Sequence, residues 1–185
     1  MFGRTEVRVL EEKDGVIYDS DTADILHWYD RFTLRIILAV TPSGHYFPAI
    51  LRDGLLRPKT SVIPIRFKGT VIYWAAKEGA PDETLEKLGV RVLNPPESDE
   101  PYNFMSADVI WPEKWFFGWR ALMRNYDGRL WMLNSFNIEM LGIRAKWTSP
   151  IDQRKAIAWA IMKGASGDML KMLGIEDTDI YKRAP

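Results

Sequence analysis

The sequence predicts an α+β fold, in which three or four helices pack on a mainly antiparallel twisted sheet. Apolar residues alternate with a period of two from Phe32 to Val40, and the turn-forming segment 41–44 follows directly. Later in the chain, proline occurs at a position typical of a helix start, as Pro81 does, and glycine occurs at a position typical of a helix end, as Gly89 does. With 185 residues, 46% of them apolar and 27% charged, the chain is long enough to form a single domain, 1–185, with its own core.

The first half of the chain is predicted to consist mainly of hairpins. Its expected strands are 5–10, 16–18, 32–40, 45–51 and, interrupted by prolines, segments between 57 and 76, the last over 70–76. Pro42 fixes φ and Gly44 permits a positive φ, so Thr41-Pro-Ser-Gly44 predicts a tight turn. Asp21 and Asp24 are spaced to begin a short helix that ends near Tyr29.

The second half is predicted to be richer in helices, and inspection of the sequence reveals no internal repeat. The expected helices are 81–88, 112–124, 149–163 and 168–173, and the expected strands are 90–93, 129–136 and 138–147. Ser149 and Pro150 form a good helix start, and Gly164 a good stop. A strand at 70–76, a helix and a strand at 90–93 would form a small parallel crossover. The predicted core contains Leu34, Ile36, Leu38, Val71, Tyr73, Val92, Trp115, Trp119, Leu133 and Trp159.

The composition excludes several classes of protein. Lys and Arg together number 25, as do Asp and Glu, so neither a generally basic nucleic-acid-binding surface nor an acidic DNA mimic is indicated. The absence of cysteine excludes disulfides, thiol nucleophiles and thiolate metal sites. The longest apolar run, around 36–40, is too short to cross a bilayer, and the first residues do not form a signal peptide. We therefore expect a cytoplasmic protein.

An aromatic stretch in the middle of the chain is the strongest candidate for a binding surface. On a helix, Trp111, Trp115 and Trp119 would share one stripe. Burial in the core explains such a stripe, and a recognition surface explains it as well, because tryptophan, tyrosine and arginine dominate interface hot spots. The candidate partner-binding residues are Trp111, Trp115, Phe116, Trp119, Arg120 and Arg124.

A basic segment is the candidate for nucleic-acid binding. Five cations lie within seventeen positions, and adjoining strands would present them as a phosphate-contacting ribbon. They are Arg52, Arg57, Lys59, Arg66 and Lys68. The alternative is that these charges protect an edge strand from unwanted pairing.

An enzyme is the less favoured class, although early carboxylates leave a metal-dependent phosphoesterase open. The carboxylates are Asp19, Asp21, Asp24 and Asp30. They could hold magnesium, but a helix start explains Asp21 and Asp24 better, because negative charge is favourable at the N-terminus of a helix. No nucleotide-binding or nucleophile motif is present, and His27 and His45 are the only histidines. We assign no catalytic residue, metal or cofactor.

Four short segments near the two ends of the chain form a recognisable set: Tyr18-Asp-Ser-Asp-Thr-Ala23, Thr41-Pro-Ser-Gly-His-Tyr-Phe47, Lys155-Ala-Ile-Ala-Trp-Ala160 and Ser166-Gly-Asp-Met-Leu170. Together they resemble a family of small bacterial proteins carried on plasmids, integrative elements and phages. The resemblance covers the first fifty and last thirty-five residues, with 69–148 as an elaboration, and brings no catalytic residues with it. It implies a mobile-element accessory protein that binds and modulates a host or element protein, with an anti-CRISPR inhibitor as one concrete form. A homodimer also stays open.

Overall fold

The chain forms two compact units in the computed structural model, which describes residues 8–31, 34–52, 59–95, 107–115, 118–138, 142–177 and 179–182. Unit 1 comprises Met1–Lys87 with Asp179–Pro185, and unit 2 comprises Leu88–Thr178. The described strands form three antiparallel sheets, accompanied by four helices. The α+β class is thus confirmed, whereas the described strands do not form mainly one sheet. That the whole chain is one domain stays a prediction.

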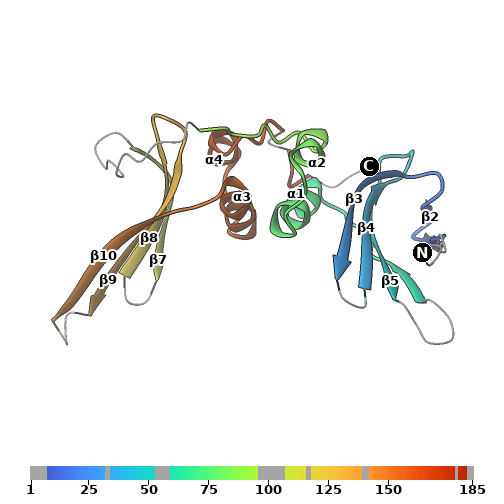
Figure 1. Ribbon diagram of the computed structural model, residues 1–185, viewed down its shortest axis with the longest axis horizontal. Helices are drawn as coiled ribbons and strands as arrows, with labels where there is room; N and C mark the ends of the chain where they lie inside the picture. Colours follow the sequence, from blue (N-terminus) through green and yellow to red (C-terminus); the bar gives the residue numbers. More distant parts are fainter. Residues whose placement is uncertain are drawn as a thin grey trace, which may run out of the picture. The chain divides into compact units, whose positions relative to one another are not determined.

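Unit 1 contains a four-stranded sheet followed by two helices (Figure 1). In spatial order, the strands are β3 (Asp24–Arg31), β4 (Leu34–Val40), β5 (Tyr46–Arg52) and β6 (Lys59–Val62), and the helices are α1 (Lys68–Lys77) and α2 (Asp82–Lys87). A separate hairpin joins β1 (Leu10–Lys13) to β2 (Val16–Asp19). Figure 1 shows the helices on one side of this sheet and β2 on the other.

Both sides of the unit 1 sheet are buried. Ile37 and Ala39 of β4 pack with Val9 and Tyr18, which come from the segment around the β1–β2 hairpin. Because side chains alternate along a strand, the neighbouring Leu38, which is also fully buried, points to the opposite side. On that side α2 is joined to β3, since the Thr84 hydroxyl donates to the Leu26 carbonyl over 2.9 Å.

Unit 2 contains a second four-stranded sheet followed by two helices. In spatial order the strands are β10 (Ile143–Pro150), β9 (Leu130–Ile138), β8 (Gly118–Asn125) and β7 (Ala107–Trp115), and the helices are α3 (Gln153–Met162) and α4 (Gly167–Met172). The Trp111 ring of β7 meets the Trp159 ring of α3 edge to face, with centroids 6.4 Å apart. On the opposite side of the sheet, Ala121, Met123 and Leu133 form a small buried cluster. None of the described helices is long and apolar enough to span a membrane.

The two units repeat one motif, which inspection of the sequence misses. Both sheets are four-stranded meanders followed by a longer and a shorter helix. Helix α3 begins and ends 85 positions after α1, and α4 begins and ends 85 positions after α2. The first strand of each sheet carries a β-bulge at the same place, between Ile25 and His27 in β3 and between Val109 and Trp111 in β7.

Turns and side chains recur in the same register. The Gly44 amide donates to the Thr41 carbonyl, and the Gly128 amide to the Asn125 carbonyl, over 2.9 Å in each case. The two glycines have φ values of 86° and 87°. Across the helices, Ile72, Trp74, Ala75, Gly79, Ala80, Leu85, Leu88 and Gly89 recur as Ile157, Trp159, Ala160, Gly164, Ala165, Leu170, Leu173 and Gly174. Shared order, spacing and identity indicate an internal duplication of a four-strand, two-helix motif.

Several predicted elements are confirmed. The strand over 32–40, its turn and its partner are β4, the turn 41–44 and β5. The strand over 129–136 is β9, and the last two helices are α3 and α4. Gly164 ends α3 with a φ of 71°, as a glycine after a helix often does.

Five local predictions are wrong, and one of them is the strand over 90–93, where Val90 forms only an isolated bridge with Ile175. The segment 21–29 leads into β3 rather than forming a helix, because its apolar residues pair with β4. The segment 70–76 belongs to α1 and not to a strand, so there is no parallel crossover in the described chain. The segment 112–124 forms the β7–β8 hairpin instead of a helix. Ser149 and Pro150 end β10, while Asp152 caps α3 by accepting from the Arg154 amide over 2.8 Å.

The predicted core is correct in part. Ile36, Leu38, Val71 and Leu133 are buried. Leu34, Tyr73, Val92 and Trp159 are only partly buried. Trp119 is 40% exposed, because the predicted helix that would have buried it is a strand. The side chain of Trp115 lies outside the described residues.

Candidate functional site

The predicted partner-binding residues do not share one stripe. Side chains alternate along a strand, so Trp111, which pairs with Leu122, and Trp119, which pairs with Lys114, point to opposite sides of the sheet. Trp111 contacts Trp159 on the side that faces α3, hereafter the helix side. The exposed Trp119 lies on the other side, hereafter the open side. The side chain of Trp115 and the whole of Phe116 lie outside the described residues.

The two arginines of the set have structural partners on the helix side. The Arg120 Nε donates to the Asn134 Oδ1 over 3.0 Å, and the Arg124 Nη1 donates to the Met172 carbonyl over 3.0 Å. Arg124 therefore ties β8 to the end of α4, which is a role in folding. That these residues bind a partner stays a prediction.

The β9–β10 ribbon has two chemically different sides. Residues on its helix side are mostly apolar and form what we call the apolar side of the ribbon: Phe136, Ile138, Ile143, Ala145 and Trp147. Residues on its open side are polar or basic and form the basic side of the ribbon: Ser135, Asn137, Arg144 and Lys146. Trp147 is 49% and Ile143 45% exposed, so the apolar side is not covered by the core.

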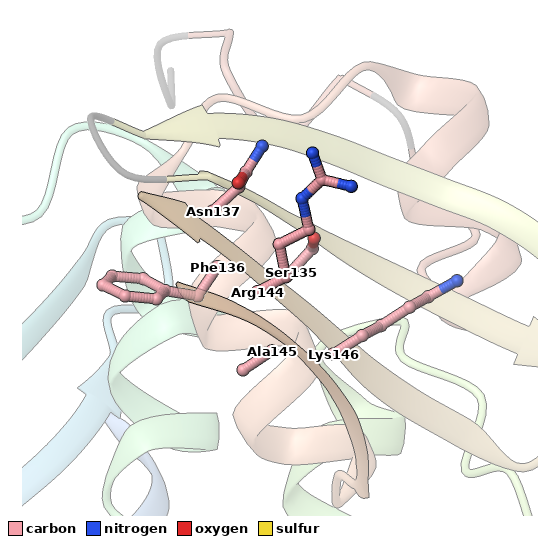
Figure 2. Close-up of a pocket in the computed structure, with 6 residues that line it drawn as sticks. All are labelled: Ser135, Phe136, Asn137, Arg144, Ala145 and Lys146. Atoms are coloured by element: carbon pink, nitrogen blue, oxygen red, sulfur yellow. The ribbon is translucent and has the colours of Figure 1, made fainter. Parts of the chain in front are cut away.

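A shallow pocket of about 250 Å³ lies on this ribbon. It is lined by Ser135, Phe136, Asn137, Arg144, Ala145 and Lys146. Figure 2 shows Asn137 and Arg144 pointing to the same side of the ribbon, while Phe136 points elsewhere. The backbone register agrees, since Asn137 and Arg144 are directly paired across the two strands.

A cross-strand row on the open side of unit 2 connects the basic side of the ribbon to the exposed tryptophan. Lys114 pairs with Trp119, Trp119 with Ser135, and Ser135 with Lys146. We call these four residues the unit 2 row. The same place in unit 1 is held by Asp30, Arg35, Leu51 and Thr60, the unit 1 row. Sequence reasoning missed the unit 2 row because its members are distant along the chain.

The predicted basic ribbon of unit 1 spans strands and a helix. Arg52 and Lys59 are paired across β5 and β6, but their side chains lie outside the described residues, as does the whole of Arg57. Arg66 forms an exposed ion pair with Asp14 at 3.6 Å, and Lys68 begins α1. A role of this segment in binding nucleic acid stays a prediction.

Three of the four early aspartates, Asp19, Asp21 and Asp30, form ion pairs with arginines. Asp19 accepts from the Arg8 Nε over 3.0 Å, and this bond holds the pKa of Asp19 below its usual value. Arg8 also pairs with Asp21 at 2.9 Å, and Asp30 pairs with Arg35 at 2.9 Å. Within the described part of the chain, no three histidine, aspartate or glutamate residues gather as metal ligands would. Asp21 and Asp24 do not begin a helix either.

The two histidines have local contacts. The His27 ring packs edge to face on the Tyr29 ring at 4.5 Å, and burial lowers the pKa of His27. His45 Nδ1 and the Ser43 hydroxyl are 3.0 Å apart, and that hydroxyl in turn bonds the Thr41 hydroxyl within the β4–β5 turn. Both contacts stabilise local structure.

Comparison of the chain with models of protein families, with curated proteins and with solved structures finds no match. The functional proposals therefore rest on the geometry of the described residues.

Proposed function

We propose that the protein is a non-enzymatic binding protein that engages another protein through the apolar side of the β9–β10 ribbon. The observation that supports this proposal is the exposure of Trp147 and Ile143, at 49% and 45%, on an edge strand. Exposed apolar side chains gathered on one surface mark interaction sites, and tryptophan is the residue type most enriched in hot spots.

The surroundings of Trp147 resemble the rim of an interface. Trp147 pairs across the strands with Asn134, whose amide oxygen accepts from Arg120. Further along the helix side, Glu113 of β7 forms an ion pair with Lys163 just after α3. An apolar centre beside fixed polar groups is the usual anatomy of a protein interface.

The family resemblance supplies the expected kind of partner. It favours a host or element protein met in the cytoplasm, which the protein would modulate by steric block, as an anti-CRISPR inhibitor does. Two alternatives are kept: a nucleic-acid-binding module that uses the segment Arg52 to Lys68, and a metal-dependent phosphoesterase. The phosphoesterase is weakened by Arg8, which engages both Asp19 and Asp21.

Affinity capture with matched tryptophan variants tests the proposal. The intact protein and Trp119→Ala, altered on the open side, should recover the same partner from host lysate, and Trp147→Ala should recover at least about tenfold less. Equal recovery by Trp147→Ala, or no partner at all, would contradict the proposal. Light scattering after size-exclusion chromatography separates the remaining case, in which the ribbon joins two copies of this chain and Trp147→Ala yields monomers.

A further inference from the structure

Two segments of unit 2 pair with each other and occupy equivalent places in the repeat. Segment 88–91, with the sequence Leu-Gly-Val-Arg, follows α2, and segment 173–176, with the sequence Leu-Gly-Ile-Glu, follows α4. We call them tail 1 and tail 2, and both belong to unit 2. We propose that the tails form a self-complementary docking element for a second copy of this chain. The two chains bind by reciprocal exchange, in which tail 1 of each chain pairs with tail 2 of the other.

The contacts between the tails are symmetric. The third residues of the two tails form an antiparallel bridge. The Arg91 amide donates to the Gly174 carbonyl over 2.7 Å, and the Glu176 amide donates to the Gly89 carbonyl over 3.1 Å. Each tail thus donates from its fourth residue and accepts at its second. Two segments that make the same contacts with each other are isologous, and isologous contacts join two copies of one chain in a two-fold dimer.

The pairing of the tails is part of a buried core. The apolar residues of both tails are at most 1% exposed, and they are Leu88, Val90, Leu173 and Ile175. The second position is closed as well, since a Cβ on Gly174 would lie 2.3 Å from the Arg91 carbonyl oxygen. An unpaired tail would expose two apolar side chains and leave backbone groups without hydrogen bonds. Each tail therefore needs the other kind of tail, from its own chain or from a second one.

Tail 1 is bound by a residue of the second copy of the motif, although it follows α2 of the first copy. Gln153 begins α3, and its Nε2 donates to the Arg91 carbonyl over 2.9 Å. Its Oε1 accepts from the Leu93 amide over 2.8 Å, and its Nε2 also donates to the Leu173 carbonyl of tail 2 over 2.7 Å. The end of one copy is thus already held by the other copy within this chain. A second chain offers the same groups to tail 1.

The charges at the fourth position favour reciprocal exchange over the pairing of like tails. Arg91 and Glu176 are both exposed, and they are diagonal neighbours across the bridge. Pairing of tail 1 with tail 1 of a second chain would bring two arginines to these places, and pairing of tail 2 with tail 2 would bring two glutamates. Like charges on neighbouring strands are destabilising. The favoured dimer therefore contains two pairs of tail 1 with tail 2, and each pair buries the same residues as in the monomer.

Refolding of the intact protein at two concentrations tests the inference. Monomer and exchanged dimer contain the same contacts, so their balance depends on the effective concentration of one tail near the other within a chain, which is on the order of 1 mM. Protein refolded from denaturant at about 1 mM should therefore yield comparable amounts of dimer and monomer, and protein refolded at about 10 µM should yield about 1% dimer. Size-exclusion chromatography with light scattering measures both species. Monomer alone at the higher concentration would overturn the inference.

Cysteine variants locate the contact, since the chain contains no cysteine of its own. Val90→Cys and Ile175→Cys chains, refolded together with oxidised glutathione, should form a disulfide-linked dimer, because opposite residues of an antiparallel pair lie at disulfide distance. The control chains, Glu86→Cys and Lys171→Cys, are altered at equivalent exposed positions of α2 and α4 and should crosslink at least about tenfold less. Equal crosslinking of the control chains would contradict exchange through the tails.

Two further variants separate exchange from other kinds of association. A chain that carries both Val90→Cys and Ile175→Cys, oxidised before it is unfolded, should stay monomeric at the higher concentration. Trp147→Ala should form as much dimer as the intact protein, because the inference does not depend on the proposed protein partner or on the apolar side of the ribbon. A dimer that persists in the oxidised double variant, or one that is lost in Trp147→Ala, would refute the proposed exchange.

Discussion

The two sheets of the chain share one topology but differ in what lies on the side away from their helices. In unit 1, Val9 and Tyr18 pack onto that side, and Leu51 is 7% exposed. In unit 2 the position of Leu51 is held by Ser135, between the exposed Trp119 and Lys146. One copy of the motif has therefore made this position part of its core, and the other presents polar and aromatic groups there. Such divergence between copies is what a duplication permits.

The last strands of the two sheets differ in the same way. In β6, the Val62 amide donates to the Glu11 Oε2 over 2.8 Å, and the Val62 carbonyl accepts from the Lys13 Nζ. Two side chains of β1 thus satisfy backbone groups that an edge strand would otherwise offer to another chain. β10, the corresponding strand of unit 2, lies at an edge of its sheet and is exposed over most of its length. This difference is why the surface proposed to bind a protein partner lies in unit 2.

The largest effect is expected at the start of β8, where a glycine lets the backbones of β8 and β9 lie close together. Leu34 begins β4, and Gly118 begins β8 at the matching place. Gly118→Ala should lower the free energy of unfolding of unit 2 by about 3–5 kcal/mol, because the new Cβ would meet the Ser135 backbone. Leu34→Ala, a matched change in unit 1, should leave unit 2 intact. Amide hydrogen exchange resolved by residue measures both, and unchanged protection of β8 and β9 in Gly118→Ala would refute the close approach.

Substitution of the glycines that recur in the repeat should destabilise the protein to different extents, according to the atoms that surround each glycine. Gly164 and Gly174 both have positive φ, of 71° and 89°, but a Cβ on Gly174 would lie 2.3 Å from the Arg91 carbonyl oxygen, and one on Gly164 would meet nothing within 4 Å. Gly174→Ala should therefore lower the free energy of unfolding by about 3 kcal/mol, and Gly164→Ala should lower it by about 1 kcal/mol. Gly79→Ala, in the first copy, should resemble Gly164→Ala. Denaturant unfolding of the three variants gives the comparison, and equal losses would contradict it.

The sequence predicted hairpins well where turn chemistry was explicit. Thr41-Pro-Ser-Gly44 identified β4 and β5 because proline and glycine restrict the turn. The aromatic stretch was misassigned because a spacing of four residues, as between Trp111 and Trp115, fits one face of a helix and also one side of a strand. No glycine–asparagine pair marked the connection between β7 and β8. The segment 70–76 misled because Val71 and Ile72 favour strands in isolation, and burial against neighbours overrode that propensity.

The repeat itself was the missed signal. Trp74 and Ala75 match Trp159 and Ala160, which the sequence did place in a helix. Recognition of that match would have corrected α1. The unit 2 row was beyond sequence reasoning in any case, since it depends on the register of four strands, and a shift of one residue would send Trp119 to the helix side.

A smaller effect on stability is expected from the residue that precedes the first helix of each unit. Asp152 caps α3, whereas Phe67 occupies the same place before α1 and makes no side-chain cap. Asp152→Ala should destabilise unit 2 by about 1 kcal/mol, and Phe67→Asp should stabilise unit 1 by a similar amount, since Phe67 is 43% exposed and its backbone is extended. Thermal unfolding of the single and double variants checks this, and the double variant should show additive shifts.

The smallest effect expected is that mild acid lowers the stability of unit 1 and not that of unit 2. Both histidines of the chain lie in unit 1, and burial holds the pKa of His27 below 6.5. The unfolded chain then binds a proton near pH 6.5 and the folded unit only at lower pH, so the stability of unit 1 falls as pH decreases through this window. The pKa of Asp19 is lowered by its bond to Arg8, so protonation of Asp19 lowers the stability of unit 1 only in stronger acid, below about pH 4. Hydrogen-exchange protection, corrected for intrinsic rates, should therefore decrease in β3 and β4 between pH 7 and 5 and stay constant in β8 and β9. His27→Gln should abolish the decrease, and a decrease that persists in this variant would assign the acid sensitivity to another group.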